Sequence, residues 1–140
     1  SKSTFSFPVS KNFVRGYSNG KKVNYHFHLH KAAAGLWTTS EDLSKFIIEI
    51  QRSYQGKSEL LSKKYARKML KPVVKAEGNF MALGFFITKD KKHFYHTGHN
   101  VGFGNKILAN FNGNGIVILT DEEHSKEFIK EVIKQKTDLK

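Results

Sequence analysis

Residues 103–120 read FGNKILANFNGNGIVILT, and this stretch decides the fold class. Two mainly apolar runs, residues 103–111 and 116–120, lie on either side of Asn112 and Gly113. Asn-Gly is the strongest short-range signal for a β-hairpin, because both residues accept the positive φ angles that a tight hairpin turn requires. The stretch therefore predicts two antiparallel strands joined by a turn.

The residues before this hairpin also predict β-structure. Residues 80–88 are apolar on both faces, as expected of one strand that is covered on each side. Asp90-Lys91-Lys92 then predicts a turn that leads into a second strand through about residue 96. Nearer the N-terminus, residues 1–31 predict irregular or strand-like structure, and residues 23–30 alternate in the manner of a strand.

Two helices are expected between these β-rich parts. Thr39 with Asp42 three residues later forms a capping box, which marks the start of a helix. Apolar residues then recur at helical spacing, and they are Leu43, Phe46, Ile47 and Ile50. This helix is expected to end near Gly56. A shorter helix over residues 62–70 is expected to stop before Pro72, because proline disfavours helical backbone in the residue that precedes it.

The chain is expected to close with a further helix. Four apolar residues would form its buried stripe, and they are Phe128, Ile129, Val132 and Ile133. Acidic residues at its start and lysines near its end would both favour the helix dipole, and they are Asp121, Glu122, Glu123, Lys134 and Lys136. Taken together, the patterns predict an α+β fold, in which helices flank an antiparallel β-sheet of hairpins.

The composition limits the class of protein. A chain of 140 residues and 16.0 kDa has the size of one domain. Hydrophobic residues make up 39% of it, which excludes a disordered tail or a collagen-like repeat. Cysteine is absent, so disulfides, thiolate metal sites and a cysteine nucleophile are excluded. No apolar run approaches the roughly 18 to 20 residues of a membrane span.

The chain is strongly basic, with a formal net charge of +12. A basic surface attracts polyanions such as nucleic acid, anionic lipid and anionic wall polymers. The sequence has no zinc-finger spacing, no helix-turn-helix with basic residues on a recognition helix and no signature of an RNA-recognition sheet. Nucleic acid is therefore not an expected partner, and most of the dispersed lysines are expected to form a solvated surface.

Three histidines would share one face of the strand expected over residues 23–30, and they are His26, His28 and His30. Imidazoles at this spacing can bind one metal ion. A strand with aromatic and aliphatic side chains inward and histidines toward water explains the same residues. Because no carboxylate lies nearby in the sequence, we favour the second interpretation and expect no metal site.

Ser18-Asn19-Gly20-Lys21 matches the Ser-x-x-Lys pattern of acyl-transfer enzymes, and Tyr17-Ser18-Asn19 matches a Tyr-x-Asn pattern. In such enzymes the serine and lysine lie one turn apart on a helix. Here the two matches overlap in a glycine-broken stretch, so Ser18 would have to serve both motifs. We therefore expect both matches to be fortuitous.

A second glycine-rich stretch, residues 95–104, is expected to connect two strands. Gly98, Gly102 and Gly104 would let the backbone approach another group closely. The polar residues beside them would suit the rim of a substrate cleft. An ordinary glycine-containing connection explains the same residues, and the chemistry alone does not choose between these interpretations.

The order of several segments resembles the serine β-lactamase and penicillin-binding-protein-like family, the relatives of the class C β-lactamases. The matching segments are Arg15-Gly16-Tyr17 (ARGY), residues 33–46 (AGGLWSTAxDLxxF), residues 83–86 (GLGW), His96-Thr97-Gly98 (Lys/His-Thr/Ser-Gly), Gly102-Phe103-Gly104-Asn105 (GFGS) and residues 115–121 (GIVVLTN). The resemblance spans nearly all of the chain but covers less than half of a family domain. It implies that residues 1–140 are a single partial domain, the C-terminal segment, and that the family's Ser-x-x-Lys and Tyr-x-Asn lie upstream.

The resemblance also implies roles for the third motif, which borders the active site in the family. The backbone N–H of His99 would form part of the oxyanion hole, Thr97 would bind a substrate carboxylate or carbonyl, and Gly98 would leave room for it. His96 stands where β-lactamases have lysine. A histidine at this position is common among the esterase and peptidase relatives of the family. The implied catalytic residues are thus His96, Thr97, Gly98 and His99, with substrate contacts from Thr97, His99 and Asn100. Asp121 and Ala34 depart from the family's usual Asn and Gly.

The function that follows is that of the C-terminal segment of a bacterial serine hydrolase. The family acts by acyl transfer on D-Ala-D-Ala peptides, β-lactams or esters, uses no cofactor and resides outside the cytoplasm. Without the upstream nucleophile, the chain alone is expected to be inactive, and its first partner would be the missing N-terminal part of the same protein. The alternative is a non-catalytic basic module that binds an anionic cell-wall polymer or a membrane surface.

Overall fold

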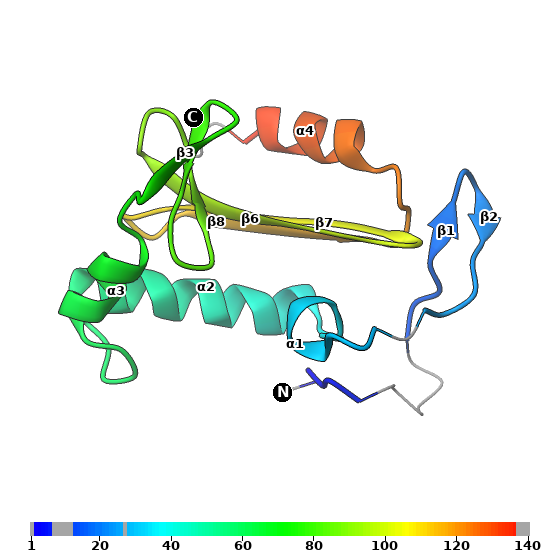
Figure 1. Ribbon diagram of the computed structural model, residues 1–140, viewed down its shortest axis with the longest axis horizontal. Coiled ribbons are helices and arrows are strands. Elements are labelled where there is room, and N and C mark those ends of the chain that lie inside the picture. Colours follow the sequence, from blue (N-terminus) through cyan, green and yellow to red (C-terminus); the bar gives the residue numbers. More distant parts are fainter. Residues whose placement is uncertain (1, 7–12, 27, 137–140) are drawn as a thin grey trace.

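A computed structural model describes residues 2–6, 13–26 and 28–136. Within them, a six-stranded antiparallel sheet has the order β3-β4-β5-β6-β7-β8, so that each strand pairs with its neighbour in sequence. Helix α2 lies along one face of the sheet and α4 along the other, while the β1–β2 hairpin stands beyond one end (Figure 1). The predicted α+β class, with helices flanking a sheet of hairpins, is confirmed.

The strands of the main sheet are β3 (Val74–Ala76), β4 (Asn79–Met81), β5 (Phe86–Ile87), β6 (His93–Asn100), β7 (Phe103–Asn110) and β8 (Gly115–Thr120). The separate hairpin is formed by β1 (Tyr17–Ser18) and β2 (Lys21–Lys22). The helices are α1 (Lys31–Ala34), α2 (Ser40–Gln55), α3 (Lys63–Met69) and α4 (Lys126–Lys134). None of the described helices is long and apolar enough to cross a bilayer.

Helix α2 begins and ends where the sequence predicts. The Thr39 hydroxyl oxygen accepts the N–H of Asp42 at 3.2 Å, which satisfies one of the free donors of the first turn. At the other end Gly56 adopts the left-handed conformation, with a φ of 81°, that commonly closes a helix. Ile47 and Ile50 are buried against the sheet, as their spacing predicts.

The β7–β8 hairpin is also confirmed, with strand ends within one residue of the prediction. Its turn is longer than a two-residue Asn-Gly hairpin, because β7 ends at Asn110 and β8 begins at Gly115. The Asn110 side-chain oxygen accepts the N–H groups of Asn112, Gly113 and Asn114, at 2.9, 3.0 and 3.0 Å. An asparagine side chain thus satisfies the turn's backbone donors.

The prediction of one strand over residues 80–88 is wrong. Ala82 donates its N–H to the carbonyl of Phe85 at 2.8 Å, and Gly84 has a φ of 79°, so the chain reverses and forms β4 and β5 as a hairpin. The continuous apolar run arises because both short strands and their turn contribute residues to the core. A second short hairpin precedes it, between β3 and β4, and its turn contains Glu77 at a φ of 47°.

Three further expectations need correction. Strand β2 ends at Lys22, and the described residues of 23–30 form no strand. His30 instead directly precedes α1. Residues 95–104 are not a connection, since they form the end of β6, a two-residue turn and the start of β7. Phe128 is 61% exposed and does not join the buried stripe of α4, in which Ile129 is the buried residue.

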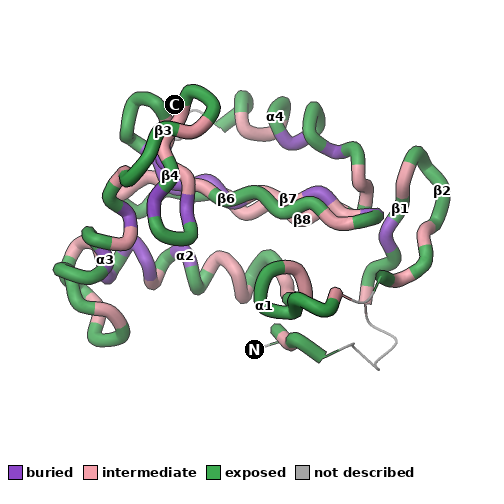
Figure 2. The backbone as a smooth tube through the Cα atoms, viewed as in Figure 1, coloured by how far each residue is buried: buried purple, intermediate pink, exposed green. Residues whose placement is uncertain are grey.

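The core lies between α2 and the sheet, where buried residues of both meet (Figure 2). Phe94 of β6 is its centre, with no exposed surface. Its ring packs edge-on against Phe85, with ring centroids 5.4 Å apart, and against Phe111 at 5.6 Å. This packing fixes the position of β6, the strand that carries the residues of the predicted site.

Candidate functional site

All of the predicted site residues lie on β6, in one continuous segment. His93 and Phe94, at the start of the strand, are buried, whereas His96, Thr97, Gly98 and His99 are exposed. The change occurs because β5 is only two residues long and pairs with β6 no further than Tyr95. The structure thus brings the third-motif residues together on the uncovered half of a strand whose other half is anchored in the core.

On the side away from β7, this half-strand has no partner strand among the described residues. In an antiparallel ladder, successive residues direct their N–H and C=O groups to opposite sides. His93 accepts the N–H of Thr88 with its carbonyl, at 3.0 Å, so its backbone groups face β5, and those of Thr97 and His99 face the same way by alternation. No described strand pairs with Thr97 or His99 on that side. We refer to the backbone groups of these two residues as the open edge.

The side chains of this segment divide between the two faces of the sheet. His96 shares the face of Phe94, which packs against α2, and its ring centroid lies 6.0 Å from that of Phe86. Thr97 and His99 share the opposite face, which α4 partly covers. The Asn100 amide donates to the carbonyl of Ala34 at 3.1 Å, so this side chain joins the end of β6 to α1.

Lys106 lies directly opposite Thr97 on β7. Its ammonium nitrogen is 5.0 Å from the centroid of the Tyr95 ring, which places a positive charge on the same face as Thr97. Burial lowers the pKa of Lys106, and the nearby ammonium groups of Lys130 and Lys126 lower it further.

The β1–β2 hairpin packs against the turn between β6 and β7. The Tyr17 N–H is shared between the carbonyls of Asp121, at 2.8 Å, and Gly102, at 3.2 Å. A Cβ on Gly16 would lie 2.8 Å from the Gly102 carbonyl oxygen, and one on Gly102 would lie 2.5 Å from a Val23 methyl. Both positions therefore require glycine for the two turns to meet.

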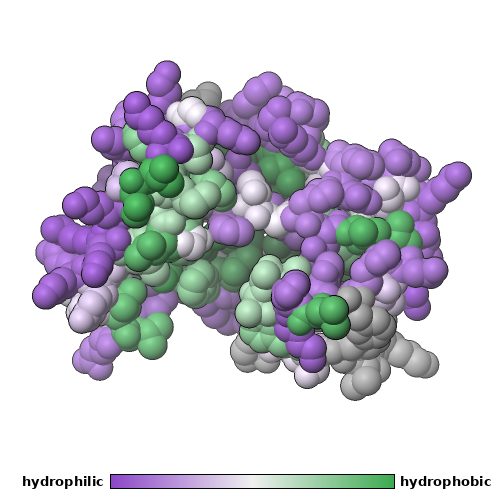
Figure 3. Space-filling model, in the orientation of Figure 1, coloured by the Kyte–Doolittle hydropathy of each residue, from purple (hydrophilic) through white to green (hydrophobic). Residues whose placement is uncertain are grey.

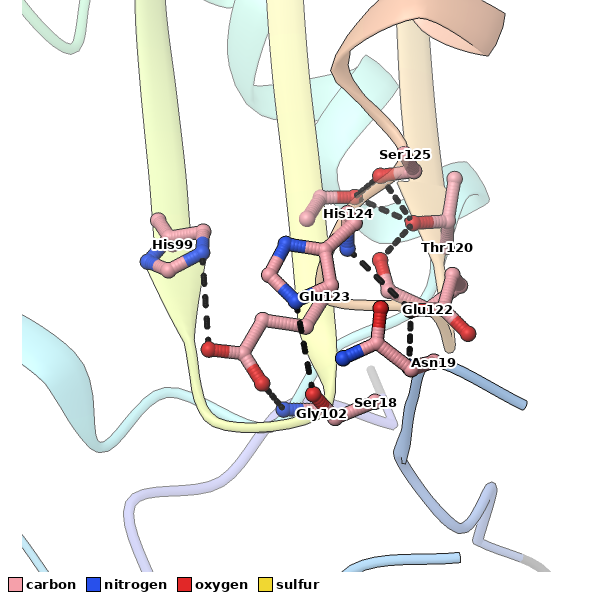
Figure 4. Close-up of polar contacts among 10 residues, drawn as sticks. Ser18, Asn19, His99, Gly102, Thr120, Glu122, Glu123, His124 and Ser125 are labelled. Atoms are coloured by element: carbon pink, nitrogen blue, oxygen red, sulfur yellow. Dashed lines mark hydrogen bonds and ion pairs between the residues drawn. The ribbon is translucent and has the colours of Figure 1, made fainter. Parts of the chain in front are cut away.

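Two carboxylates hold the same junction together (Figure 4). Glu122 accepts the N–H groups of Asn19 and Gly20, at 3.2 and 3.4 Å, and Glu123 accepts the N–H of Gly102 at 3.4 Å. The N–H of His124 is the main cause that lowers the pKa of Glu122. The pKa of Glu123 is also lowered, mainly by the Ser18 hydroxyl.

These carboxylates were expected at the start of the closing helix, where they would favour its dipole. The helix begins later, at Lys126, and the acidic residues precede it in the turn after β8. The contacts of Glu122 with the β1–β2 turn join residues 102 and 103 positions apart, and Glu123 reaches Gly102 across 21 positions, so no local pattern could have revealed them. Glu123 also lies 3.8 Å from Nε2 of His99, which connects this junction to the open edge.

Ser18 is not placed as an acyl-transfer nucleophile. It pairs with Lys21 across the β1–β2 hairpin instead of preceding it on a helix, and Asn19 and Gly20 form the turn with φ angles of 53° and 71°. The Ser18 hydroxyl lies 3.5 Å from Nε2 of His124, across from the turn after β8. These contacts support the interpretation that the Ser-x-x-Lys match is fortuitous.

A metal centre finds no support in the described part of the chain, where no three His, Asp or Glu side chains gather closely enough to hold an ion. The alternation that would place His26, His28 and His30 on one face requires a strand, and the described residues of this segment do not form one.

The comparisons with known proteins support the fold. A penicillin-binding protein from Bacillus halodurans has a similar structure, with a TM-score of 0.62 and 23% sequence identity. The chain has a penicillin-binding-protein-like fold. The match covers 72% of this chain but only 31% of the other, so the chain spans about a third of that protein's length. No family model matches the sequence, and no curated protein matches it.

Proposed function

We propose that the chain is the C-terminal segment of a β-lactamase-related serine hydrolase, in which it supplies the strand that borders the active site. The observation that carries this proposal is the open edge, the backbone groups of Thr97 and His99 that no described strand pairs with. It lies on a strand fixed by a buried core, within a penicillin-binding-protein-like fold. The nucleophilic serine would come from upstream polypeptide of the same protein, which would be the first partner of this chain.

In the proposed reaction, the upstream serine oxygen attacks the substrate carbonyl, and its proton passes to an upstream base. The carbonyl oxygen becomes an oxyanion, which the N–H of His99 stabilises by a hydrogen bond. The C–N or C–O bond to the leaving group then breaks, and the leaving group takes up the proton. The carbonyl of Thr97 and its hydroxyl would align the rest of the substrate, and Gly98 leaves the approach clear.

The proposed substrate class comes from the family resemblance and is compatible with the open edge. An extended peptide can add to an exposed strand edge through backbone hydrogen bonds. D-Ala-D-Ala peptides, β-lactams and small esters all present a carbonyl that this edge could accept. His96, in the position of the family's lysine, favours a peptidase or esterase over a dedicated β-lactamase. Residence outside the cytoplasm would accompany this function.

The test separates the backbone of His99 from its side chain, in the protein with its upstream polypeptide. His99→Pro removes the N–H but breaks no ladder bond, because this N–H faces away from β7. His99→Ala keeps the N–H and is the matched control. We expect the proline variant to slow acylation by a fluorescent penicillin or ester by about 10²–10³-fold, the usual effect of losing an oxyanion-hole donor. The alanine variant should remain close to the parent protein.

Equal rates in the parent protein and the proline variant would contradict the proposed role. The 140-residue chain provides a second test, by intact mass after incubation with a fluorophosphonate or a penicillin. We expect no adduct. A stoichiometric adduct on Ser18 would mean that the nucleophile lies within this chain, and that its position on the β1–β2 hairpin has been misjudged.

A further inference from the structure

Half of the net positive charge is concentrated in one short segment. Residues 60–76 contain six basic residues and no acidic ones, which accounts for six of the twelve net charges. The basic residues are Lys63, Lys64, Arg67, Lys68, Lys71 and Lys75. Helix α3 lies within this segment, and its first turn carries no acidic residue.

Helix α3 carries four of these basic residues, Lys63, Lys64, Arg67 and Lys68. Ala66 and Leu70 are buried, with 0% and 3% exposure, and attach the helix to the rest of the molecule. Lys64 and Lys68 lie one turn apart on the helix and are exposed, and Lys71, just after the end of the helix, is exposed as well. We refer to these three residues as the lysine row. Helix α4 differs, because Lys130 and Lys134 each pair with a glutamate of the same helix.

Apolar side chains in or next to the same segment are also exposed. Leu60 is 80% exposed, Tyr65 60%, Val73 69% and Leu83 55%. Backbone contacts bring the last of these to the helix, since Leu83 donates its N–H to the carbonyl of Met69 at the end of α3, at 3.0 Å. Figure 3 shows hydrophobic side chains among hydrophilic ones at this end of the molecule.

We propose that this α3 surface, the lysine row with Leu60, Tyr65, Val73 and Leu83, docks on an anionic lipid bilayer. Lysine clusters on an amphipathic surface are attracted to acidic headgroups, by about 1 kcal/mol per charge near the membrane. The exposed apolar residues favour a bilayer over a soluble polyanion as the binding partner. A bilayer can bury these residues at the headgroup boundary while the lysines reach the phosphates.

The position of this surface in the fold is compatible with a working site. Helix α3 lies at one end of the sheet, and the turn between β6 and β7 lies at the other (Figure 1). A chain bound to a bilayer through α3 would therefore keep the open edge away from the lipid. The inference does not depend on the proposed hydrolase function, because it uses none of the site residues.

The test is sedimentation of the 140-residue chain with phosphatidylcholine vesicles that contain either no phosphatidylglycerol or about 30% of this anionic lipid. One variant replaces Lys64, Lys68 and Lys71 with glutamine. The matched control replaces Lys126, Lys130 and Lys134, which removes the same charge from α4. We expect the α3 variant to bind acidic vesicles about 100-fold more weakly, from roughly 1 kcal/mol for each of three charges. The control should lose much less.

A second variant, Leu60→Ser with Val73→Ser, separates a bilayer from a polymer. Docking on a bilayer predicts weaker vesicle binding by this variant and unchanged binding to soluble polyphosphate. Equal vesicle binding by the parent chain and the serine variant would overturn the bilayer assignment in favour of a polyanion. Equal losses in the α3 and α4 lysine variants would overturn the site itself, since net charge alone would then explain the binding.

Discussion

Gln51 of α2 is expected to be a major determinant of stability, because its buried amide holds the β7–β8 turn. Nε2 donates to two carbonyls, those of Asn110 at 2.7 Å and Asn114 at 2.9 Å, and the residue is 3% exposed. Gln51→Leu keeps the size of the side chain but removes both hydrogen bonds. Gln55, one turn later, donates to the single carbonyl of Phe111 at 3.1 Å, so Gln55→Leu is the matched comparison.

The expected loss of stability depends on which hydrogen-bond donors each carbonyl retains after the substitution. Asn114 still accepts the N–H of Asn110 when Gln51 is replaced, whereas Asn110 loses the donor that its carbonyl has in the parent chain. A lost hydrogen bond costs about 0.5–1.5 kcal/mol, and a buried acceptor without its partner about 1–3 kcal/mol. We therefore expect the free energy of unfolding to fall by about 2–4 kcal/mol for Gln51→Leu and by about 0.5–1.5 kcal/mol for Gln55→Leu.

Urea unfolding followed by far-ultraviolet circular dichroism measures both values. The order of the two variants matters more than either number, because both replacements are chemically the same. A Gln51→Leu chain as stable as the Gln55→Leu chain would mean that α2 does not hold the turn through the Gln51 amide.

Other substitutions test separate parts of the structure. Phe94→Ala should lower the free energy of unfolding by about 3–5 kcal/mol in urea titrations, because it empties the centre of the core. Thr39→Ala should cost about 1 kcal/mol by the same measurement, through loss of the α2 cap. Gly102→Ala should cost about 1–3 kcal/mol, because its Cβ meets Val23 and its φ is positive. Glu122 has a lowered pKa in the folded chain, so its contribution is present above about pH 4.5, the ordinary value, and is lost as the pH falls through the lower folded pKa. Glu122→Gln should therefore make thermal stability less dependent on pH in this acidic range, and an unchanged pH profile would contradict the role of Glu122.

The parts of the fold that follow from local chemistry could be predicted from the sequence. Helix α2 has its start and end encoded in Thr39 and Gly56. Asn112 and Gly113 mark the place of the β7–β8 turn, although the turn is longer than this pair alone predicts. The failures occurred where tertiary packing replaces local pattern. The run over residues 80–88 is apolar throughout, so periodicity could not reveal the reversal at its centre. The glycine at position 84, which adopts a positive φ in the structure, was the one sign in the sequence of a turn within this run.

The candidate site also has one part that the sequence could predict and another that depends on tertiary structure. Its motif, His96-Thr97-Gly98, is visible in the sequence, and the structure places it on an exposed half-strand. The open edge itself could not be predicted, because it depends on β5 ending after two residues. The contact of Glu122 with the β1–β2 turn and that of Glu123 with the β6–β7 turn were equally hidden, because each connects parts of the chain that are not neighbours in sequence.

Amide hydrogen exchange along β6, measured residue by residue by NMR, tests the open edge most directly. After correction for intrinsic rates, we expect fast exchange at Thr97 and His99 and slow exchange at Gly98 between them, because only the Gly98 N–H faces β7. Slow exchange at all three residues would show that another segment covers this edge. It would contradict the claim that β6 offers free backbone donors to a substrate.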